Sequence, residues 1–184
     1  SREKTIASMA EPAMLMAIFT VSLVCKSTSL SQMVHVIAHG ELILRPSLAF
    51  ALLSFVLISL AETGRVPVDN PATHLELTMI HEGMVLEYSG RHLALMEWAG
   101  MMKLFLFATL GIAAFFPWGI AAANDFNSLF VAALSLVLKL TAAGIGLVLI
   151  ETGLAKMRLF RVPEFLGSAF LFATLGMLSY FMLE

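Results

Sequence analysis

The chain has 184 residues, of which 59% are hydrophobic and only 13% charged, and its net charge is −2. In soluble domains about a quarter of the residues are charged, so most of this chain's surface is expected to face lipid. The small net charge excludes nucleic acid as an expected partner. The single cysteine, Cys25, excludes an internal disulfide and any cysteine-based zinc or iron–sulfur site within this chain.

Five apolar stretches predict an all-α fold, a polytopic transmembrane helix bundle that forms a single membrane domain over residues 1–184. They are Pro12–Cys25, Pro46–Ala61, Leu104–Asn124, Phe126–Ile150 and Phe165–Leu183. A helix needs about 20 residues to cross about 30 Å of hydrocarbon, and the first two stretches are shorter. We therefore expect these helices to extend through a carboxylate, Glu11 in the first and Glu62 in the second. Short core helices of a soluble protein are the alternative, which the three full-length spans disfavour.

Lysine and arginine are distributed unevenly between the connections. When the connections are assigned to alternate sides of the membrane, one side carries seven of these residues and the other two. The seven are Arg2, Lys4, Arg65, Arg91, Lys156, Arg158 and Arg161, and the two are Lys26 and Arg45. Because short cytoplasmic loops are enriched in lysine and arginine, we expect the loop over residues 62–92 to be cytoplasmic.

This cytoplasmic loop holds most of the residues that could carry chemistry. After Pro71, Thr73 and Glu76 have the spacing of a capping box, which predicts a helix from about His74 to Tyr88. An apolar side of this helix indicates that it is partly buried, with an ordinary solvated surface helix as the alternative. The ionisable residues of the loop are Glu62, Arg65, Asp69, His74, Glu76, His81, Glu82, Glu87, Arg91 and His92.

The segment that starts at His81 and Glu82 begins like the zinc-protease pattern H-E-x-x-H. That chemistry needs two histidines one helical turn apart, and the second position holds Val85. His74 and His81 would project from the same face of a helix, so they cannot hold a haem from opposite sides. We therefore predict no metal site in this chain.

Lys139 lies in the middle of the apolar stretch Phe126–Ile150. A lysine at the bilayer centre costs at least about 2.5 kcal/mol, so it is expected to face the bundle interior and to have a partner. We predict a proton or ion relay, with a salt bridge used only for packing as the alternative. Glu97 and Lys103 are either part of the same buried polar line or anchors at the membrane interface.

The stretch from Ala61 to Pro71 reads Ala-Glu-Thr-Gly-Arg-Val-Pro-Val-Asp-Asn-Pro and resembles the A-E-T-x-R-x-P-x-D-x-P signature of the complex I subunit 1 family. That family includes the membrane subunit (subunit 4) of group 4, formate hydrogenlyase-type hydrogenases. Further similar features follow in order. They are Glu76-Leu77, Glu87-Tyr88-Ser89-Gly90, Lys139 and the basic connection with Lys156, Arg158 and Arg161. The segment from Ser1 to Pro12 resembles the hydrogenase-type approach to the fourth helix. Because the family has eight transmembrane helices, the resemblance implies that the first three precede this chain.

The resemblance implies an ion-translocating anchor, a non-catalytic subunit that couples redox chemistry in a peripheral arm to movement of H⁺ or Na⁺ across a prokaryotic inner (cell) membrane. By position, the candidate coupling residues are Glu11, Glu62, Arg65, Asp69, Glu76, Glu87 and Lys139, to which the loop adds Glu82. His74, His81, Glu97 and Lys103 are further candidates. The implied partners are iron–sulfur and large hydrogenase-like subunits, antiporter-like membrane subunits and the lipid bilayer.

No cofactor is expected in this chain, and the iron–sulfur clusters, with nickel–iron in a hydrogenase, belong to the partner subunits. Two loop carboxylates that are usual in quinone-reducing members are replaced by Ala72 and His74, which disfavours quinone and favours a hydrogenase-type member. Two alternatives stay open. One is a secondary transporter that uses Lys139 and Glu97, although no inverted repeat is evident. The other is a purely structural anchor.

Overall fold

The computed structural model describes residues 2–39, 45–65, 68, 88–120, 126–153 and 162–183, and within these ranges it is helical, without a strand. In chain order the helices are α1 (Arg2–Cys25), α2 (Leu30–His39), α3 (Pro46–Glu62), α5 (Gly90–Phe115), α6 (Phe126–Gly153) and α7 (Val162–Leu183). Four of them, α1, α5, α6 and α7, are long and apolar enough to cross a membrane, and α3 is a shorter apolar helix. The predicted all-α membrane bundle is confirmed.

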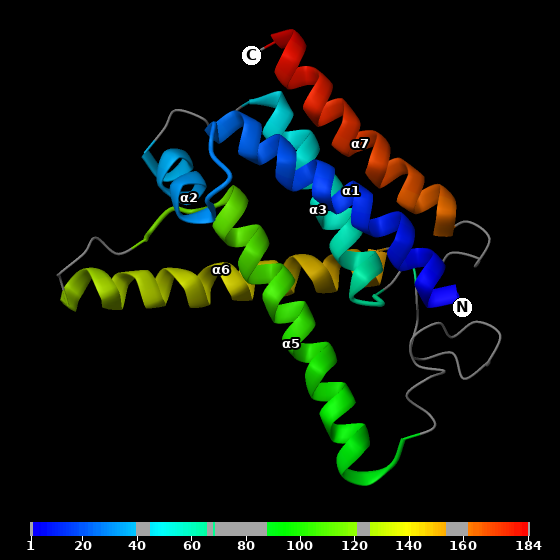
Figure 1. Cartoon of the computed structure of the whole chain (residues 1–184). Helices are drawn as coiled ribbons and strands as arrows, with labels where there is room; N and C mark the ends of the chain where they lie inside the picture. The colour runs from blue at the N-terminus through cyan, green and yellow to red at the C-terminus, as the bar shows by residue number, and fades with distance from the viewer. Residues whose placement is uncertain are drawn as a thin grey trace.

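Helices α1, α3 and α7 lie side by side and form the core, with α3 running opposite to the other two (Figure 1). Small residues line their contacts, which lets the backbones approach closely. The fully buried ones are Ala10, Ala13, Ala17, Ser47, Ala51, Ser54, Ala169 and Ala173. A Cβ added to Gly176 would lie 3.1 Å from the carbonyl oxygen of Ser47. The hydroxyl of Ser54 donates a hydrogen bond of 2.7 Å to the carbonyl oxygen of Ala169, so α3 and α7 are also joined by a buried polar contact.

The two shortest predicted spans both extend as far as their carboxylates. Helix α1 begins at Arg2 and passes through Glu11 and Pro12, so it reaches spanning length. Helix α3 ends at Glu62 and has 17 residues, which corresponds to about 25 Å. Because α3 is packed between α1 and α7, its short length is compensated by protein contacts on two sides.

Helix α2 was not predicted from the sequence, because its 10 residues are too few to span a membrane. The hydroxyl of Ser27 accepts a hydrogen bond of 3.1 Å from the backbone N–H of Ser29, just before the helix. Met33 and Ile37, one helical turn apart, are buried in a cluster with α1 and α3 residues. The spacing of these apolar residues was the available signal for a short amphipathic helix.

The predicted bounds of the third span, Leu104–Asn124, are wrong at both ends. Helix α5 begins at Gly90 and contains Glu97 and Lys103, which sequence reasoning treated as residues near its start. It ends at Phe115 because Pro117 lacks an N–H and disfavours helical geometry in the residue before it.

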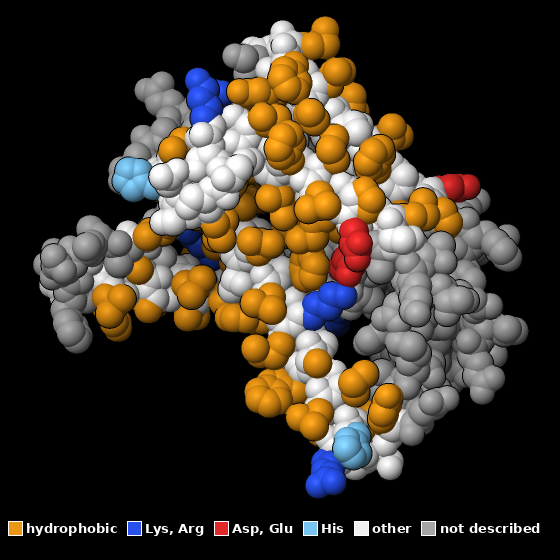
Figure 2. Space-filling model, in the orientation of Figure 1, with side chains coloured by type: hydrophobic (Ala, Val, Ile, Leu, Met, Phe, Trp, Pro, Cys, Tyr) orange, Lys and Arg blue, Asp and Glu red, His pale blue; other side chains and the backbone are white. Residues whose placement is uncertain are grey.

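Helices α5 and α6 extend away from the three-helix core and cross each other (Figure 1). No residue from 127 to 153 in α6 is buried, and Ala114 is the only buried residue of α5. Hydrophobic side chains are exposed over the visible surface of the described helices, including α5 and α6 (Figure 2). Such all-round apolar exposure is typical of helices whose environment is lipid or other membrane helices.

Candidate functional site

The end of α3 positions the two charged residues that open the loop over residues 62–92. Gly64 has a φ of +62°, and its N–H donates to the carbonyl oxygen of Ala61 at 3.3 Å. The N–H of Arg65 reaches back to the carbonyl oxygen of Leu60 at 3.0 Å. This pair of bonds is a Schellman motif, in which glycine is the residue best suited to the left-handed position. The helix therefore ends at Glu62 and the chain turns sharply at Arg65.

The turn after Arg65 is fixed to the core. The N–H of Val68 donates to the carbonyl oxygen of Arg65 at 2.9 Å. Val68 is buried in a cluster that includes Ala10 of α1, Ile58 of α3 and Val162 of α7. Arg65 thus lies between two backbone anchors, so its Cα has a defined place at the end of the three-helix core.

Glu62 forms an ion pair with Lys103 of α5. Lys103 Nζ lies 2.8 Å from Glu62 Oε2, and the side chains are 47% and 16% exposed, respectively. Acidic and basic side chains meet on the apolar face where α3 approaches α5 (Figure 2). Lys103 of α5 is therefore the ion-pair partner of the signature carboxylate.

Arg65 forms a second ion pair, with Glu151 in the last turn of α6. Arg65 Nη1 lies 3.5 Å from Glu151 Oε1, and both side chains are partly exposed. Sequence reasoning missed Glu151, although it directly follows the predicted apolar span and lies on the same predicted side as residues 62–92. We call Glu62, Arg65, Lys103 and Glu151 the loop-end cluster, which joins the end of α3 to α5 and to the end of α6.

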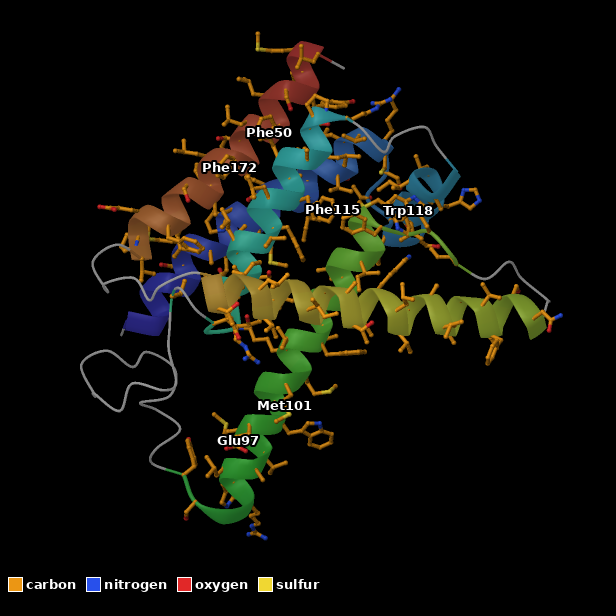
Figure 3. All side chains as sticks on the ribbon, turned by 180° about the vertical axis from the view of Figure 1, so that it is seen from behind. Phe50, Glu97, Met101, Phe115, Trp118 and Phe172 are labelled. Atoms are coloured by element: carbon orange, nitrogen blue, oxygen red, sulfur yellow. The ribbon has the colours of Figure 1, made fainter. Side chains whose placement is uncertain are left out.

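Lys139 lies near the middle of α6 and contacts the chain segment that follows α5. Its Nζ donates to the carbonyl oxygen of Phe116 at 2.6 Å and also to that of Trp118. One turn earlier, the hydroxyl of Ser135 donates to the carbonyl oxygen of Gly119 at 3.1 Å. Phe115 and Trp118 mark this end of α5 in Figure 3. The predicted partner of Lys139 is thus a set of backbone carbonyls, whose negative ends favour a cation at a helix C-terminus.

Gly119 makes this contact possible. It has a φ of +75°, and a Cβ at this position would lie 2.8 Å from the Ser135 hydroxyl oxygen. Any other residue would combine an unfavourable backbone conformation with a steric clash. The sequence therefore specifies a close approach between the turn after α5 and the Lys139 side of α6.

The two remaining described carboxylates of the predicted site are separate from this cluster. Glu11 on α1 and Glu97 on α5 are both exposed, and neither has an ion-pair partner within the described parts of the chain. Glu97 lies toward the end of α5 that is away from α6 (Figure 3). The structure therefore groups Lys103, but not Glu97, with Glu62.

The other predicted site residues and the expected helix from His74 to Tyr88 lie outside the described residues, apart from Tyr88 itself. The site residues concerned are Asp69, His74, Glu76, His81, Glu82 and Glu87. Among the residues that the structure describes, no three histidine, cysteine, aspartate or glutamate side chains are arranged to hold a metal ion. An apolar cavity of about 20 Å³ between α1, α2, α3 and α5 is too small for an organic ligand.

Within its described residues the chain is helical and has four apolar helices of membrane-spanning length, so it is an integral membrane protein. The family model for NADH dehydrogenase matches residues 1–182, and the chain belongs to this family. It is 27% identical over 179 residues to formate hydrogenlyase subunit 4 of Escherichia coli (strain K12), with 97% of this chain and 57% of the relative covered. It is 29% identical over 181 residues to hydrogenase-4 component C of the same organism, with 96% and 55% covered. The chain thus spans a little more than half the length of these relatives, and the resemblance predicted from its sequence is confirmed.

Proposed function

We propose that this chain belongs to an ion-coupling membrane anchor subunit of a multisubunit oxidoreductase of the hydrogenase-4, formate hydrogenlyase or NADH dehydrogenase type. In this proposal it has no complete active site and links redox chemistry in partner chains to movement of H⁺ or Na⁺. The observation that carries the proposal is the loop-end cluster, in which the signature residues Glu62 and Arg65 are each paired with a charge on another helix.

The Glu62–Lys103 pair provides a charge that responds to its surroundings. Glu62 is largely buried and is balanced by one cation at 2.8 Å. Redox change in a neighbouring iron–sulfur chain would alter the electric field at the loop and change the relative stability of the protonated and charged forms of its carboxylates. Protonation of Glu62 would remove its attraction for Lys103 and so change the force between α3 and α5.

Lys139 forms a second polar contact, which joins α6 to the segment after α5. Lys103 and Phe116, whose carbonyl oxygen accepts from Lys139, are thirteen residues apart in sequence, which corresponds to about 20 Å along α5. Helices α5 and α6 therefore connect the loop-end cluster to an amine near the middle of an apolar span. Such a sequence of ionisable groups is what ion movement within a membrane protein requires.

The same geometry disfavours a secondary transporter with Lys139 and Glu97 in one site. Glu97 is nineteen residues before Phe116, or about 28 Å along α5 from the carbonyl that Lys139 contacts. The two side chains therefore lie at different depths of the bundle. A transporter of this type would place them around one substrate near the bilayer midplane.

The proposed assembly places residues 62–92 and 154–161 on the cytoplasmic side of a prokaryotic inner membrane, where iron–sulfur and large hydrogenase-like subunits would dock. The Arg65–Glu151 pair supports a common side for these two connections, because it joins the residues at their beginnings. Antiporter-like subunits would contact the chain within the membrane. The exposed apolar surfaces of α5 and α6 are suited to such neighbours and to lipid.

The test is made in the complete protein within its native complex. Lys139→Met and Glu62→Gln are each expected to reduce ion movement per electron pair at least twofold while the complex still assembles and transfers electrons. Glu164→Gln, which alters an exposed carboxylate in the first turn of α7, is the matched control and is expected to leave this ratio unchanged. Lys139→Arg, which retains the charge, is expected to preserve more ion movement than Lys139→Met.

Unchanged ion movement in both Lys139→Met and Glu62→Gln would contradict ion coupling and leave a structural anchor as the explanation. Purification of the tagged protein provides a separate test of the complex. Co-purification with iron–sulfur and large catalytic chains is expected. Isolation as a single transporting species without redox partners would contradict the proposed assembly.

A further inference from the structure

Helix α6 is attached to the rest of the described chain in an unusual way. Its residues from 127 to 153 include none that is buried, whereas α1, α3 and α7 share an extensive core. Packing therefore contributes little to the position of α6 within the parts of the chain that the structure describes. The position of α6 therefore depends mainly on its polar contacts.

These polar contacts occur at two points along α6. At its end, Glu151 pairs with Arg65. Near its middle, Lys139 donates to the carbonyl oxygens of Phe116 and Trp118 after α5, and Ser135 donates to that of Gly119. Lys139 and Glu151 are twelve residues apart, which corresponds to about 18 Å along the helix axis. Two contacts at this separation are enough to define both the position and the tilt of a helix.

The two ends of the Arg65–Glu151 pair differ in how firmly they are held. Arg65 follows the Schellman motif of α3 and precedes the buried Val68, so its backbone is tied to the three-helix core. Glu151 belongs to α6, in which none of the residues from 127 to 153 is buried. When the pair forms or breaks, the element expected to change position is therefore α6.

From these contacts we propose that Glu151 is a positioning residue, whose ion pair with Arg65 holds α6 against the core and thereby sets where Lys139 lies relative to the end of α5. This inference rests on the proposed function, because it makes the position of α6 the link between the loop and Lys139. It assigns a role to a carboxylate outside the family signature.

Direct electrostatic interaction couples the Arg65–Glu151 pair to Lys139 only weakly. Two unit charges about 18 Å apart interact only weakly at an effective dielectric constant of about 20. A shift of α6 acts on Lys139 through hydrogen bonds to carbonyl oxygens, which are lost over a displacement of about 1 Å. The position of the helix is thus the more sensitive way to transmit a change from Arg65 to Lys139.

The test measures the position of α6 directly. In the complete protein with Cys25 and any other cysteine replaced, spin labels at Leu149 of α6 and Leu171 of α7 report the distance between this helix and the core by pulsed electron spin resonance. Both side chains are exposed. Labels at Leu53 of α3 and Leu171 provide the matched control within the core. The protein is studied in lipid nanodiscs.

Glu151→Gln is expected to shift or broaden the Leu149–Leu171 distance distribution, to leave the Leu53–Leu171 distribution unchanged, and to reduce ion movement per electron pair in the native complex at least twofold. Glu151→Asp, which retains the charge, is expected to preserve both properties. An unchanged Leu149–Leu171 distance in Glu151→Gln would overturn the positioning role. A shifted distance with an unchanged ratio of ions to electrons would overturn the link to Lys139.

If the Glu151→Gln protein does not accumulate, the double variant Arg65→Glu with Glu151→Arg, which exchanges the two charges, is used instead. Its Leu149–Leu171 distance alone then tests the positioning role. Return of the Leu149–Leu171 distribution to that of the unaltered protein supports the proposal, and a distribution that stays shifted overturns it. The distance measurement does not depend on ion movement. Failure of the proposed function, seen as normal ion movement in Lys139→Met and Glu62→Gln, is therefore distinguishable from failure of the positioning role.

Discussion

The Glu62–Lys103 ion pair is asymmetric, and this asymmetry predicts which single substitution destabilises the protein more. Glu62 is 16% exposed and Lys103 is 47% exposed. Lys103→Met leaves the largely buried carboxylate without its cation, and loss of one partner of such a pair costs about 3 kcal/mol. Glu62→Gln leaves the lysine, which is the more exposed partner, and retains a side chain that can hydrogen-bond. Its expected cost is about 1 kcal/mol.

The double substitution Glu62→Gln with Lys103→Met removes both charges, so no buried charge is left without a partner. Its expected cost is about 2 kcal/mol, which gives a coupling energy of about 2 kcal/mol between the two sites. The free energy of unfolding is measured on the purified complete protein by titration with a denaturing detergent in mixed micelles, followed by circular dichroism. Equal effects of the two single substitutions, or a double variant whose loss is the sum of both, would refute this reasoning.

Three further predictions concern the packing and the turns, and each is measured by the same unfolding titration. Gly176→Val is expected to destabilise by about 2 kcal/mol because its Cβ would meet the backbone of α3, whereas Gly167→Ala, with nothing within 4 Å, is expected to be neutral or stabilising. Similar effects at the two glycines would contradict the close approach of α3 and α7. Lys26→Gly is expected to stabilise the protein by about 1 kcal/mol, because Lys26 has a φ of +53° in the turn after α1. A loss of stability in this variant would show that the lysine side chain has another role. Ser54→Ala is expected to cost about 0.6 kcal/mol through loss of the bond to Ala169, and an unchanged stability would show that this bond contributes nothing net.

Much of the fold could be predicted from the sequence, because membrane-spanning helices are constrained by length and hydrophobicity. The short apolar stretch before Cys25 required extension through Glu11, and α1 does pass through it. Helix ends predicted from the local sequence were wrong where tertiary contacts determine them. The start of α5 was missed because charged residues suggested a boundary, whereas Lys103 is accommodated within the helix by its ion pair with Glu62.

The candidate site was predictable only in part, for a related reason. The signature motif identified Glu62 and Arg65, and the length of the apolar span identified Lys139. Their partners could not be inferred, because Lys103 and Glu151 are 41 and 86 residues away from Glu62 and Arg65, respectively. Pairing over such separations depends on how the helices pack, which no local pattern in a single sequence specifies.

The close packing of α3 against α7 has a consequence for how the protein is made. The hydroxyl of Ser54 bonds to a carbonyl that lies 115 residues later in the chain. At a synthesis rate of about 5–20 residues per second, α7 emerges from the ribosome roughly 6–23 s after this part of α3. During that interval α3, with only 17 residues, lacks one of the two helices that compensate for its length. We therefore expect α3 to stay with the insertion machinery, together with α1, until α7 arrives, so that the core closes only after α7 has been synthesised.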